Sequence, residues 1–168
     1  IYVGEPVLYT VRVFRRVRIL DNDYKKPNFD SFHSERLPDT PSYYVTVEGF
    51  RYEVSELRYL LTGVQAGDVR IEPVELACDF LDMSKPMNAL DVIMGRQPVI
   101  TKTYYSNSPT IHIKELPEYD GDIPFSGLVG DFQLSAKLDR EVVPQGDSAT
   151  LLLTVSGQGN VMDAGEPD

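Results

Sequence analysis

The stretch Val7-Leu-Tyr-Thr-Val-Arg-Val-Phe-Arg-Arg-Val-Arg-Ile-Leu20 decides the fold class of this 168-residue chain. Its odd positions are almost all β-branched or aromatic, whereas its even positions are largely polar and include Arg12, Arg16 and Arg18. A period of two residues is typical of a β-strand with one buried face and one solvated face. Arg15 interrupts the apolar face, which indicates a bulge or the end of the buried part. The stretch therefore predicts an all-β chain.

Further strands are predicted along the rest of the chain. The runs Tyr43–Val47 and Phe50–Val54 flank Glu48-Gly49, which predicts either a hairpin or a strand with a glycine bulge. Ser55–Leu61 either continues as a strand or winds one helical turn. The remaining predicted strands are 69–73, 99–105, 110–114, 132–143 and 149–155. The predicted core residues are Tyr9, Val11, Val13, Val45 or its neighbour, and Ile111.

Two segments carry no clear strand signal. The polar stretch Asp21–Pro41 contains Pro and Asn turn signals, and it is predicted to be a long functional or mobile loop. Residues 77–98 give no legible period, and the loosely spaced Met83, Met87 and Met94 are typical of gap-filling core side chains.

Composition narrows the class of protein. The net charge is −10, and residues 115–168 hold only Lys137 and Arg140 against eleven acids. Such an acidic segment repels phosphate backbones, so no nucleic-acid partner is expected. Cys78 is the only cysteine and there is no Trp, which excludes an antibody-type domain but not other sandwiches. No apolar run is long enough for a membrane span, and no signal peptide is recognisable in this sequence.

An internal repeat suggests the domain organisation. Gly4–Val13 aligns with Gly146–Val155, each with Gly and an acid before an alternating strand. We therefore expect an immunoglobulin-like sandwich module at 1–117 that lacks its first strand, a hinge at 118–130, and the opening strands of a second module at 131–168. The chain is expected to be a piece of a longer protein.

The sequence offers little catalytic or metal-binding chemistry. His33 is predicted in a loop and His112 on a strand, and neither has the spacing of a catalytic or zinc motif. The chain is expected not to be an enzyme and to bind no cofactor. Calcium held by Glu118, Asp120 and Asp122 is left open against the simpler interpretation of solvated acids.

Several blocks of sequence resemble the BatD family, the aerotolerance-related exported proteins of Gram-negative bacteria. The blocks occur in the same order over nearly the whole chain, with little contribution from 77–98. They are Val3–Pro6, Pro27–Phe32, Val47–Val54, Ala66–Pro73, Ile111–Pro117 and Pro124–Gly130, running on to Val155–Asn160. An aromatic residue commonly follows the phenylalanines of the Pro27–Phe32 block in the family, whereas this chain has His33.

The resemblance implies a location and partners. It implies a protein exported to the periplasm and anchored in the inner membrane, with tandem sandwich modules that bind other proteins. Family members are usually encoded beside a MoxR-type ATPase and membrane-tethered von Willebrand A-domain proteins. The implied role is a non-catalytic scaffold in an envelope complex linked to aerotolerance (oxygen tolerance) and stress response. A carbohydrate- or surface-binding sandwich is the alternative, for which Tyr43, Tyr44, Tyr104 and Tyr105 are conceivable contacts.

Two sets of residues are predicted to carry this role. Asp120, Asp122, Phe29 and Phe32 are the hypothesised partner contacts, and an acid at 120 or 122 is hypothesised to complete the metal site of an A-domain partner. Phe125, Gly127 and Gly130 are the hypothesised inter-module hinge. Phe125 is expected to fill the junction, and the glycines are expected to adopt backbone angles closed to other residues.

Overall fold

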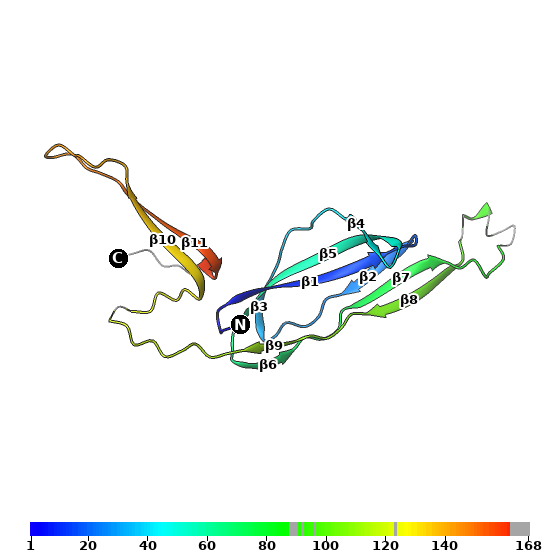
Figure 1. Cartoon of the computed structure of the whole chain (residues 1–168). Helices are drawn as coiled ribbons and strands as arrows, with labels where there is room; N and C mark the ends of the chain where they lie inside the picture. The colour runs from blue at the N-terminus through cyan, green and yellow to red at the C-terminus, as the bar shows by residue number, and fades with distance from the viewer. Residues whose placement is uncertain (88–90, 92, 96, 123, 162–168) are drawn as a thin grey trace.

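The computed structural model describes residues 1–87, 91, 93–95, 97–122 and 124–161 (Figure 1). The fold is all-β and sandwich-like, with several antiparallel sheets, as the alternating sequence pattern predicts. The strands are β1 (Pro6–Arg15), β2 (Asp21–Lys25), β3 (Phe32–Arg36), β4 (Tyr43–Val47), β5 (Phe50–Gly63), β6 (Gly67–Arg70), β7 (Glu75–Leu81), β8 (Val99–Tyr105), β9 (Thr110–Ile113), β10 (Gly130–Leu138) and β11 (Leu151–Gly159).

The long strand β5 organises the first sheet. β1 pairs with it along one edge, from Pro6 opposite Thr62 to Arg15 opposite Glu53. On its other edge, β4 pairs with the first part of β5 and β3 with the last part. Ser55–Leu61 thus continues as strand, because the whole segment pairs with β1 and its last residues also pair with β3.

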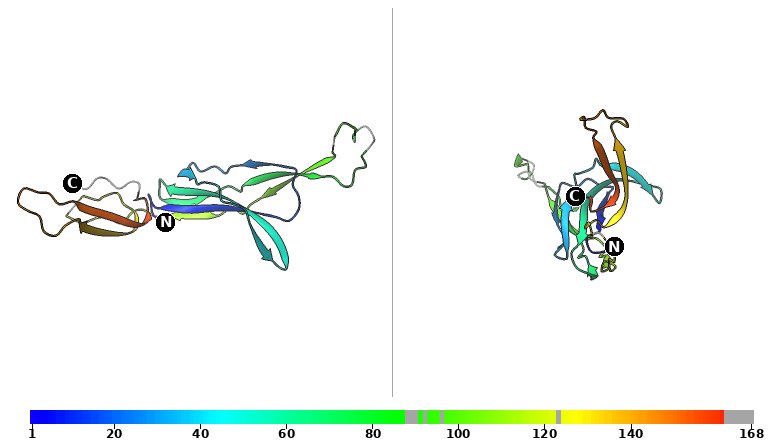
Figure 2. Two further views of the ribbon diagram at one scale, coloured as in Figure 1. Left: turned by 90° about the horizontal axis from the view of Figure 1, so that it is seen from above. Right: turned by 90° about the vertical axis from the view of Figure 1, so that its left-hand side faces the viewer.

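The hairpin between β4 and β5 forms at Glu48-Gly49, as one of the two sequence interpretations predicts. Both residues have positive φ, 51° and 80°. Two central residues of this kind match the twist of a tight β-hairpin, and Gly49 accepts the geometry without steric cost. The hairpin projects from the body of the sandwich (Figure 2).

The second sheet has the order β2–β7–β8, and β6–β9 forms a two-stranded ladder beside it along the chain. This topology corrects the prediction of a loop over 21–41, because that stretch contains both β2 and β3. β2 and β3 are short and mostly polar, and their pairing partners lie far along the chain in β7 and β5. Edge strands of this kind give no period-two apolar signal.

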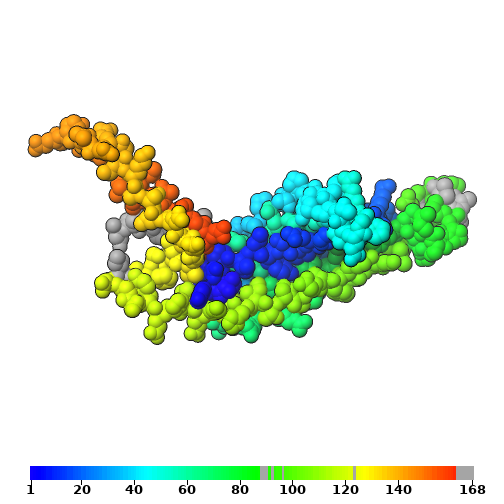
Figure 3. Space-filling view, in the orientation of Figure 1, coloured from blue at the N-terminus to red at the C-terminus, as the bar shows by residue number. Residues whose placement is uncertain are grey.

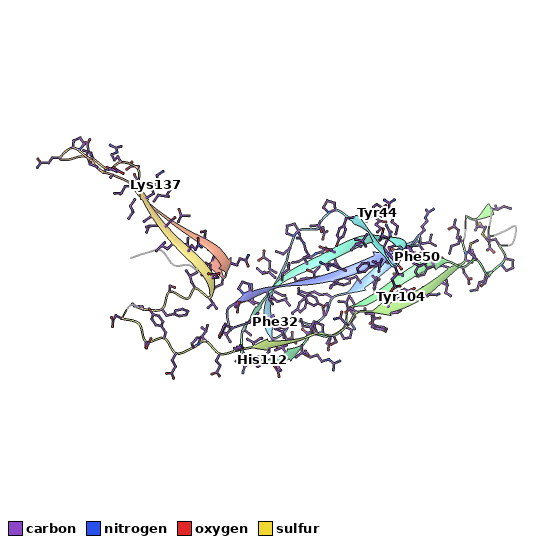
Figure 4. All side chains as sticks on the ribbon, in the orientation of Figure 1. Phe32, Tyr44, Phe50, Tyr104, His112 and Lys137 are labelled. Atoms are coloured by element: carbon purple, nitrogen blue, oxygen red, sulfur yellow. The ribbon has the colours of Figure 1, made fainter. Side chains whose placement is uncertain are left out.

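The packed core lies at the end of the sandwich where β3, β6 and β9 meet β1 and β5. Figure 4 shows Phe32 within this region. Tyr9, Val7 and Ile111 are half-buried against the core, and Ile113 is almost fully buried where Ile111 was the prediction. The buried cluster consists of Phe29, Phe32, Tyr59, Leu61, Ile71 and Ile113. Burial of each such side chain contributes about 1.5–3 kcal/mol relative to exposure.

β10 and β11 form a separate two-stranded antiparallel ribbon. Its glycines Gly130 and Gly159 face each other in the register, and a Cβ on Gly159 would overlap the Phe132 ring and the Val129 carbonyl. The base of the ribbon therefore depends on glycine, with one aromatic ring covering the pair. Most side chains of the ribbon are exposed, including Lys137 (Figure 4).

The observed strand bounds adjust several predictions. β1 ends at Arg15, five residues before the end of the alternating stretch, and β10 ends at Leu138 where the prediction runs to Val143. Part of the illegible stretch 77–98 belongs to β7, whereas residues 88–90, 92 and 96 lie outside the described residues.

Candidate interaction surface

An exposed group of aromatic and arginine side chains lies where β1 ends beside the β4–β5 hairpin. We call it the tip surface and define it as Phe14, Arg16, Tyr44, Phe50 and Arg51. The Arg16 guanidinium carbon lies 4.2 Å from the Phe50 ring centroid, and that of Arg51 lies 4.0 Å from the Tyr44 ring centroid. Phe50 remains 51% exposed and Tyr44 60% exposed. The two labelled rings of the tip surface appear at this end in Figure 4.

Ion pairs fix the strands that carry the tip surface. Arg15 donates to Glu53 at 2.6 Å, and Arg12 donates to Glu56 at 2.9 Å, both across the β1–β5 pair. The Tyr43 hydroxyl also donates to Glu56, at 2.8 Å. Hydrogen bonds from Tyr43 and then Arg12 lower the pKa of Glu56 below its ordinary value. The arginine stripe predicted as a solvated face is thus partly paired with acids.

Arg16 and Arg18 differ from their neighbours because no hydrogen bond or ion pair to an acid involves them in the described part of the chain. With Arg51 they place positive charge around a hollow beside Tyr44 and Glu53. Exposed guanidinium groups stacked on aromatic rings keep donors free toward solvent. This chemistry suits recognition of acidic or aromatic groups on a partner.

A cleft opens between the two sheets at the end away from the core. It has a volume of about 360 Å³, and its wall includes Val13 and Phe14 of β1, Leu76 and Phe80 of β7, and Tyr104 of β8. A second hollow of about 470 Å³ reaches Val13 and Leu76 from the other side. Val13 lines both hollows, which explains why it is half-buried and not part of the core cluster.

Two of the four predicted partner contacts are corrected by burial. Phe29 and Phe32 are each 7% exposed and belong to the core cluster. The Phe29 ring contacts the rings of Tyr9 and Tyr59, with centroids 5.6 Å and 5.2 Å away. These phenylalanines hold the sheets together, so a direct contact with a partner is not available to them.

Asp120 and Asp122 are exposed and flank Gly121, as the sequence suggests. A Cβ on Gly121 would overlap the Tyr119 ring, so this ring lies directly against the loop between the two acids. The Tyr119 and Phe125 rings are also in contact, with centroids 5.7 Å apart. The loop is thus shaped by an aromatic pair beneath two outward carboxylates.

The predicted junction residues are partly corrected. Gly127 and Gly130 have positive φ, 79° and 151°, as expected, whereas Phe125 is 48% exposed and does not fill the junction. Val129 is the buried residue among those described at 118–130, and it lies beside Gly4. A single valine between glycines has no apolar periodicity, so the sequence did not predict its burial.

Asn160 was also missed from the sequence. Its side-chain oxygen accepts from the Val129 backbone N–H at 2.6 Å, and its side-chain nitrogen donates to the Gly127 carbonyl at 2.9 Å. Asn160 thereby ties the junction segment to the end of β11. In the sequence, Asn160 follows Gly157-Gln-Gly159 and is typical of a turn. The pairing of β10 with β11 is what brings it to Val129.

The two histidines lie apart from these surfaces. His112 is exposed on β9, and its Nδ1 lies 2.5 Å from an Asp68 carboxylate oxygen (Figure 4). Among the described residues, no group of three or more His, Cys, Asp or Glu side chains is placed to hold a metal ion. In the same part of the chain, no helix has the length and hydropathy needed to cross a bilayer.

Searches against protein-family models, curated proteins and solved structures give no match to this chain.

Proposed function

We propose that this chain is a non-catalytic protein-interaction module of a periplasmic envelope complex, and that the tip surface is its contact with other proteins. The complex is the one that the BatD resemblance implies, with von Willebrand A-domain proteins, a MoxR-type ATPase and a role in aerotolerance and stress resistance. The parent protein is then anchored in the inner membrane. The observation that carries the proposal is the exposed stack of Arg16 on Phe50 and Arg51 on Tyr44.

The strand pairing supports an immunoglobulin-like module. In the constant-type fold the second, fifth and fourth strands are neighbours in one sheet, and the third, sixth and seventh in the other. The orders β1–β5–β3 and β2–β7–β8 agree with this if the first strand of the fold is absent. Modules of this architecture commonly present their binding residues on loops and hairpins at one end, where the tip surface lies.

Residue chemistry supports the choice of the tip surface. Aromatic residues and Arg are enriched at protein interfaces, and hot spots are enriched in Tyr, Trp and Arg. Charge is also unevenly distributed along the chain. The arginines of the tip surface lie in residues 1–114, which are nearly neutral, whereas residues 115–168 carry a net charge of −9. An acidic partner surface is therefore attracted to the tip and repelled by the C-terminal part.

The test is capture of purified A-domain proteins by the chain and by two variants, Phe50→Ala and Arg16→Ala. We expect each to weaken binding about tenfold or more, which corresponds to about 1.4 kcal/mol. Tyr105→Ala removes an exposed ring of β8, outside the tip surface and the loop of Asp120 and Asp122, and serves as the matched control. Equal binding by all four proteins, or equal loss in the control, would contradict the assignment of the tip surface.

We propose a carbohydrate-binding role as the second candidate, because exposed rings of β1 and β8 line the cleft. Tyr104 and Tyr105 are 50% and 67% exposed on β8, although neighbouring strand residues point to opposite faces. A glycan array with wild type and Tyr104→Ala distinguishes the two roles. Binding of a defined glycan that Tyr104→Ala abolishes, together with no capture of A-domain proteins, would favour this alternative.

A further inference from the structure

We infer that the cleft between the two sheets binds a fatty acid, with the alkyl chain between β1 and β7 and the carboxylate on Arg16. Such a ligand is an amphipathic anion, and the cleft offers it an apolar wall whose charged side chains are all positive. The inference goes beyond the proposed function and does not depend on the protein partner.

The cleft has the size and the position of a ligand site. Its volume of about 360 Å³ falls in the range of small-molecule sites, roughly 300–1,000 Å³. One wall belongs to β1 and the other to β7 and β8, which are strands of different sheets. In Figure 3, β1 (blue) and the β8–β9 segment (yellow-green) run along the same face of the molecule. The buried core cluster contributes no residue to the cleft wall, so a ligand would occupy a space separate from the core.

The deepest part of the cleft is apolar. Val11, Val74 and Cys78 are its most buried lining residues. The Ser106 hydroxyl, which also lines the cleft, already accepts from the Val74 N–H at 2.9 Å and donates to the Asn107 carbonyl at 2.7 Å. An alkyl chain needs no hydrogen-bond partner in such a place, whereas a polar ligand would bury groups that find none. The wall therefore selects a hydrocarbon chain.

The charged side chains at the cleft are all of one sign. Among the described residues that line it, three are arginines, Arg12, Arg15 and Arg16, and none is Asp or Glu. This is unexpected in a chain with a net charge of −10. Arg12 and Arg15 pair with Glu56 and Glu53, which stand outside the cleft wall, whereas Arg16 has no such acid. The positive charge of Arg16 is thus available to an anionic group of a ligand.

The Arg16 guanidinium is held at the border of the cleft by aromatic rings. Its carbon lies 4.2 Å from the Phe50 ring centroid and 5.9 Å from the Tyr52 ring centroid. Tyr52 itself lines the cleft, and its ring contacts the Phe14 ring with centroids 6.2 Å apart. Stacking engages the face of the guanidinium and leaves its in-plane N–H groups free. A pair of such donors matches the two oxygens of a carboxylate.

The probe is dodecanoate, titrated by calorimetry into the 168-residue chain below the micelle concentration and with no other protein present. We expect saturable binding of one molecule per chain. Affinity should rise from octanoate through decanoate to dodecanoate, by up to about fourfold for each methylene that enters the cleft. Dodecyltrimethylammonium has the same alkyl chain and the opposite charge, and it should bind about tenfold or more weakly than dodecanoate.

Two variants test the position of the carboxylate. Arg16→Gln should weaken dodecanoate binding about tenfold or more, because charge-assisted hydrogen bonds are lost. Arg18→Gln removes the same charge from a neighbouring exposed arginine that does not line the cleft, and it should bind as wild type. Methyl NMR locates the alkyl chain. Dodecanoate should shift the methyl resonances of Val13 and Leu76, which line the cleft, and not those of Leu61 in the core cluster.

Three results would overturn the inference. One is the absence of saturable dodecanoate binding to the folded chain. Another is equal binding of dodecanoate and dodecyltrimethylammonium, or an Arg16→Gln variant that binds dodecanoate no more weakly than Arg18→Gln, since the carboxylate would then have no specific partner at the cleft. The third is binding that leaves the Val13 and Leu76 methyl resonances unchanged, because the ligand would then lie elsewhere on the molecule.

Discussion

The hydroxyl oxygens of Tyr24 and Tyr59 lie 3.3 Å apart and join the two main sheets of the sandwich. Tyr24 belongs to β2 and Tyr59 to the centre of β5, so the contact bridges strands that share no ladder. Tyr59 is almost fully buried, and its ring also packs on Phe29. Tyr59 belongs to the core cluster and Tyr24 lines the second hollow, so the pair stands where the core gives way to that hollow.

This tyrosine pair should make the protein sensitive to alkaline pH. Burial and then the hydrogen bond with Tyr59 raise the pKa of Tyr24 above the ordinary value of about 10. The folded state then keeps a proton that the unfolded state loses, so the free energy of unfolding falls as pH rises above about 10. Chemical denaturation between neutral pH and pH 11 measures the effect.

Tyr24→Phe should make that fall smaller, while lowering stability near neutral pH by about 1–3 kcal/mol, because the buried Tyr59 hydroxyl loses its partner. Tyr44→Phe, which alters an exposed phenol, is the control and should behave as wild type. An unchanged alkaline slope in Tyr24→Phe would show that another group is responsible.

Burial at β1 gives a second prediction. Val11 is 8% exposed and lies opposite Leu57, whereas Leu8 on the same strand is 54% exposed. Val11→Asp should abolish the cooperative thermal transition of the sandwich, since a buried unpaired carboxylate costs more than such a small sandwich can supply. Leu8→Asp should melt within a few degrees of wild type. A cooperative melt of Val11→Asp like that of wild type would remove Val11 from the core.

Strands with strong side-chain alternation were predictable from the sequence. β1, the β4–β5 hairpin, β8 and β9 carry β-branched and aromatic residues, and Glu48-Gly49 has the chemistry of a tight turn. β2 and β3 were not predictable from the sequence. Their segments, Asp21–Lys25 and Phe32–Arg36, contain few apolar residues and pair with β7 and β5. Their existence follows from long-range pairing that local propensity does not encode.

The candidate site was predicted less well than the fold. Phe29 and Phe32 share a polar sequence context with exposed loop residues, so their burial depends on β5 and β9 reaching the same place. The tip surface combines residues of β1, β4 and β5, and the sequence alone does not show that Arg16 meets Phe50. The polar composition of their loop predicted that Asp120 and Asp122 are exposed, and they are. Their binding role stays a prediction.

The junction offers a third prediction, at Asn160. Asn160→Asp keeps the acceptor for the Val129 N–H but replaces the donor to the Gly127 carbonyl with a second acceptor. We expect faster hydrogen exchange at residues 127–129 and a broader distance distribution in small-angle scattering, with the melt of the first module unchanged. Asn107→Asp makes the same change in a loop of the first module and should alter neither. If Asn160→Asp matches wild type in both measurements, the hydrogen bond to the Gly127 carbonyl does not hold the junction.

The acids at 120 and 122 give the last prediction, which rests on the proposed A-domain partner. Such domains hold a metal ion with an open coordination position that accepts a carboxylate from another protein. Asp120 and Asp122 are exposed on either side of Gly121, above the Tyr119 and Phe125 rings that shape the loop. A carboxylate held outward in this way is a suitable oxygen ligand for Mg²⁺.

Binding of the A-domain protein should therefore depend on Mg²⁺, and Asp120→Asn/Asp122→Asn should weaken it about as much as a chelator does, because an amide oxygen carries no charge for the metal. Glu115→Gln/Glu118→Gln removes the same charge from the same segment and separates direct ligation from general electrostatic attraction. The measurement is titration calorimetry with Mg²⁺ and with chelator. Equal weakening by both double variants at low salt, lost at high salt, would show that the acids act only through their charge, and binding that ignores chelator and both variants would end the idea.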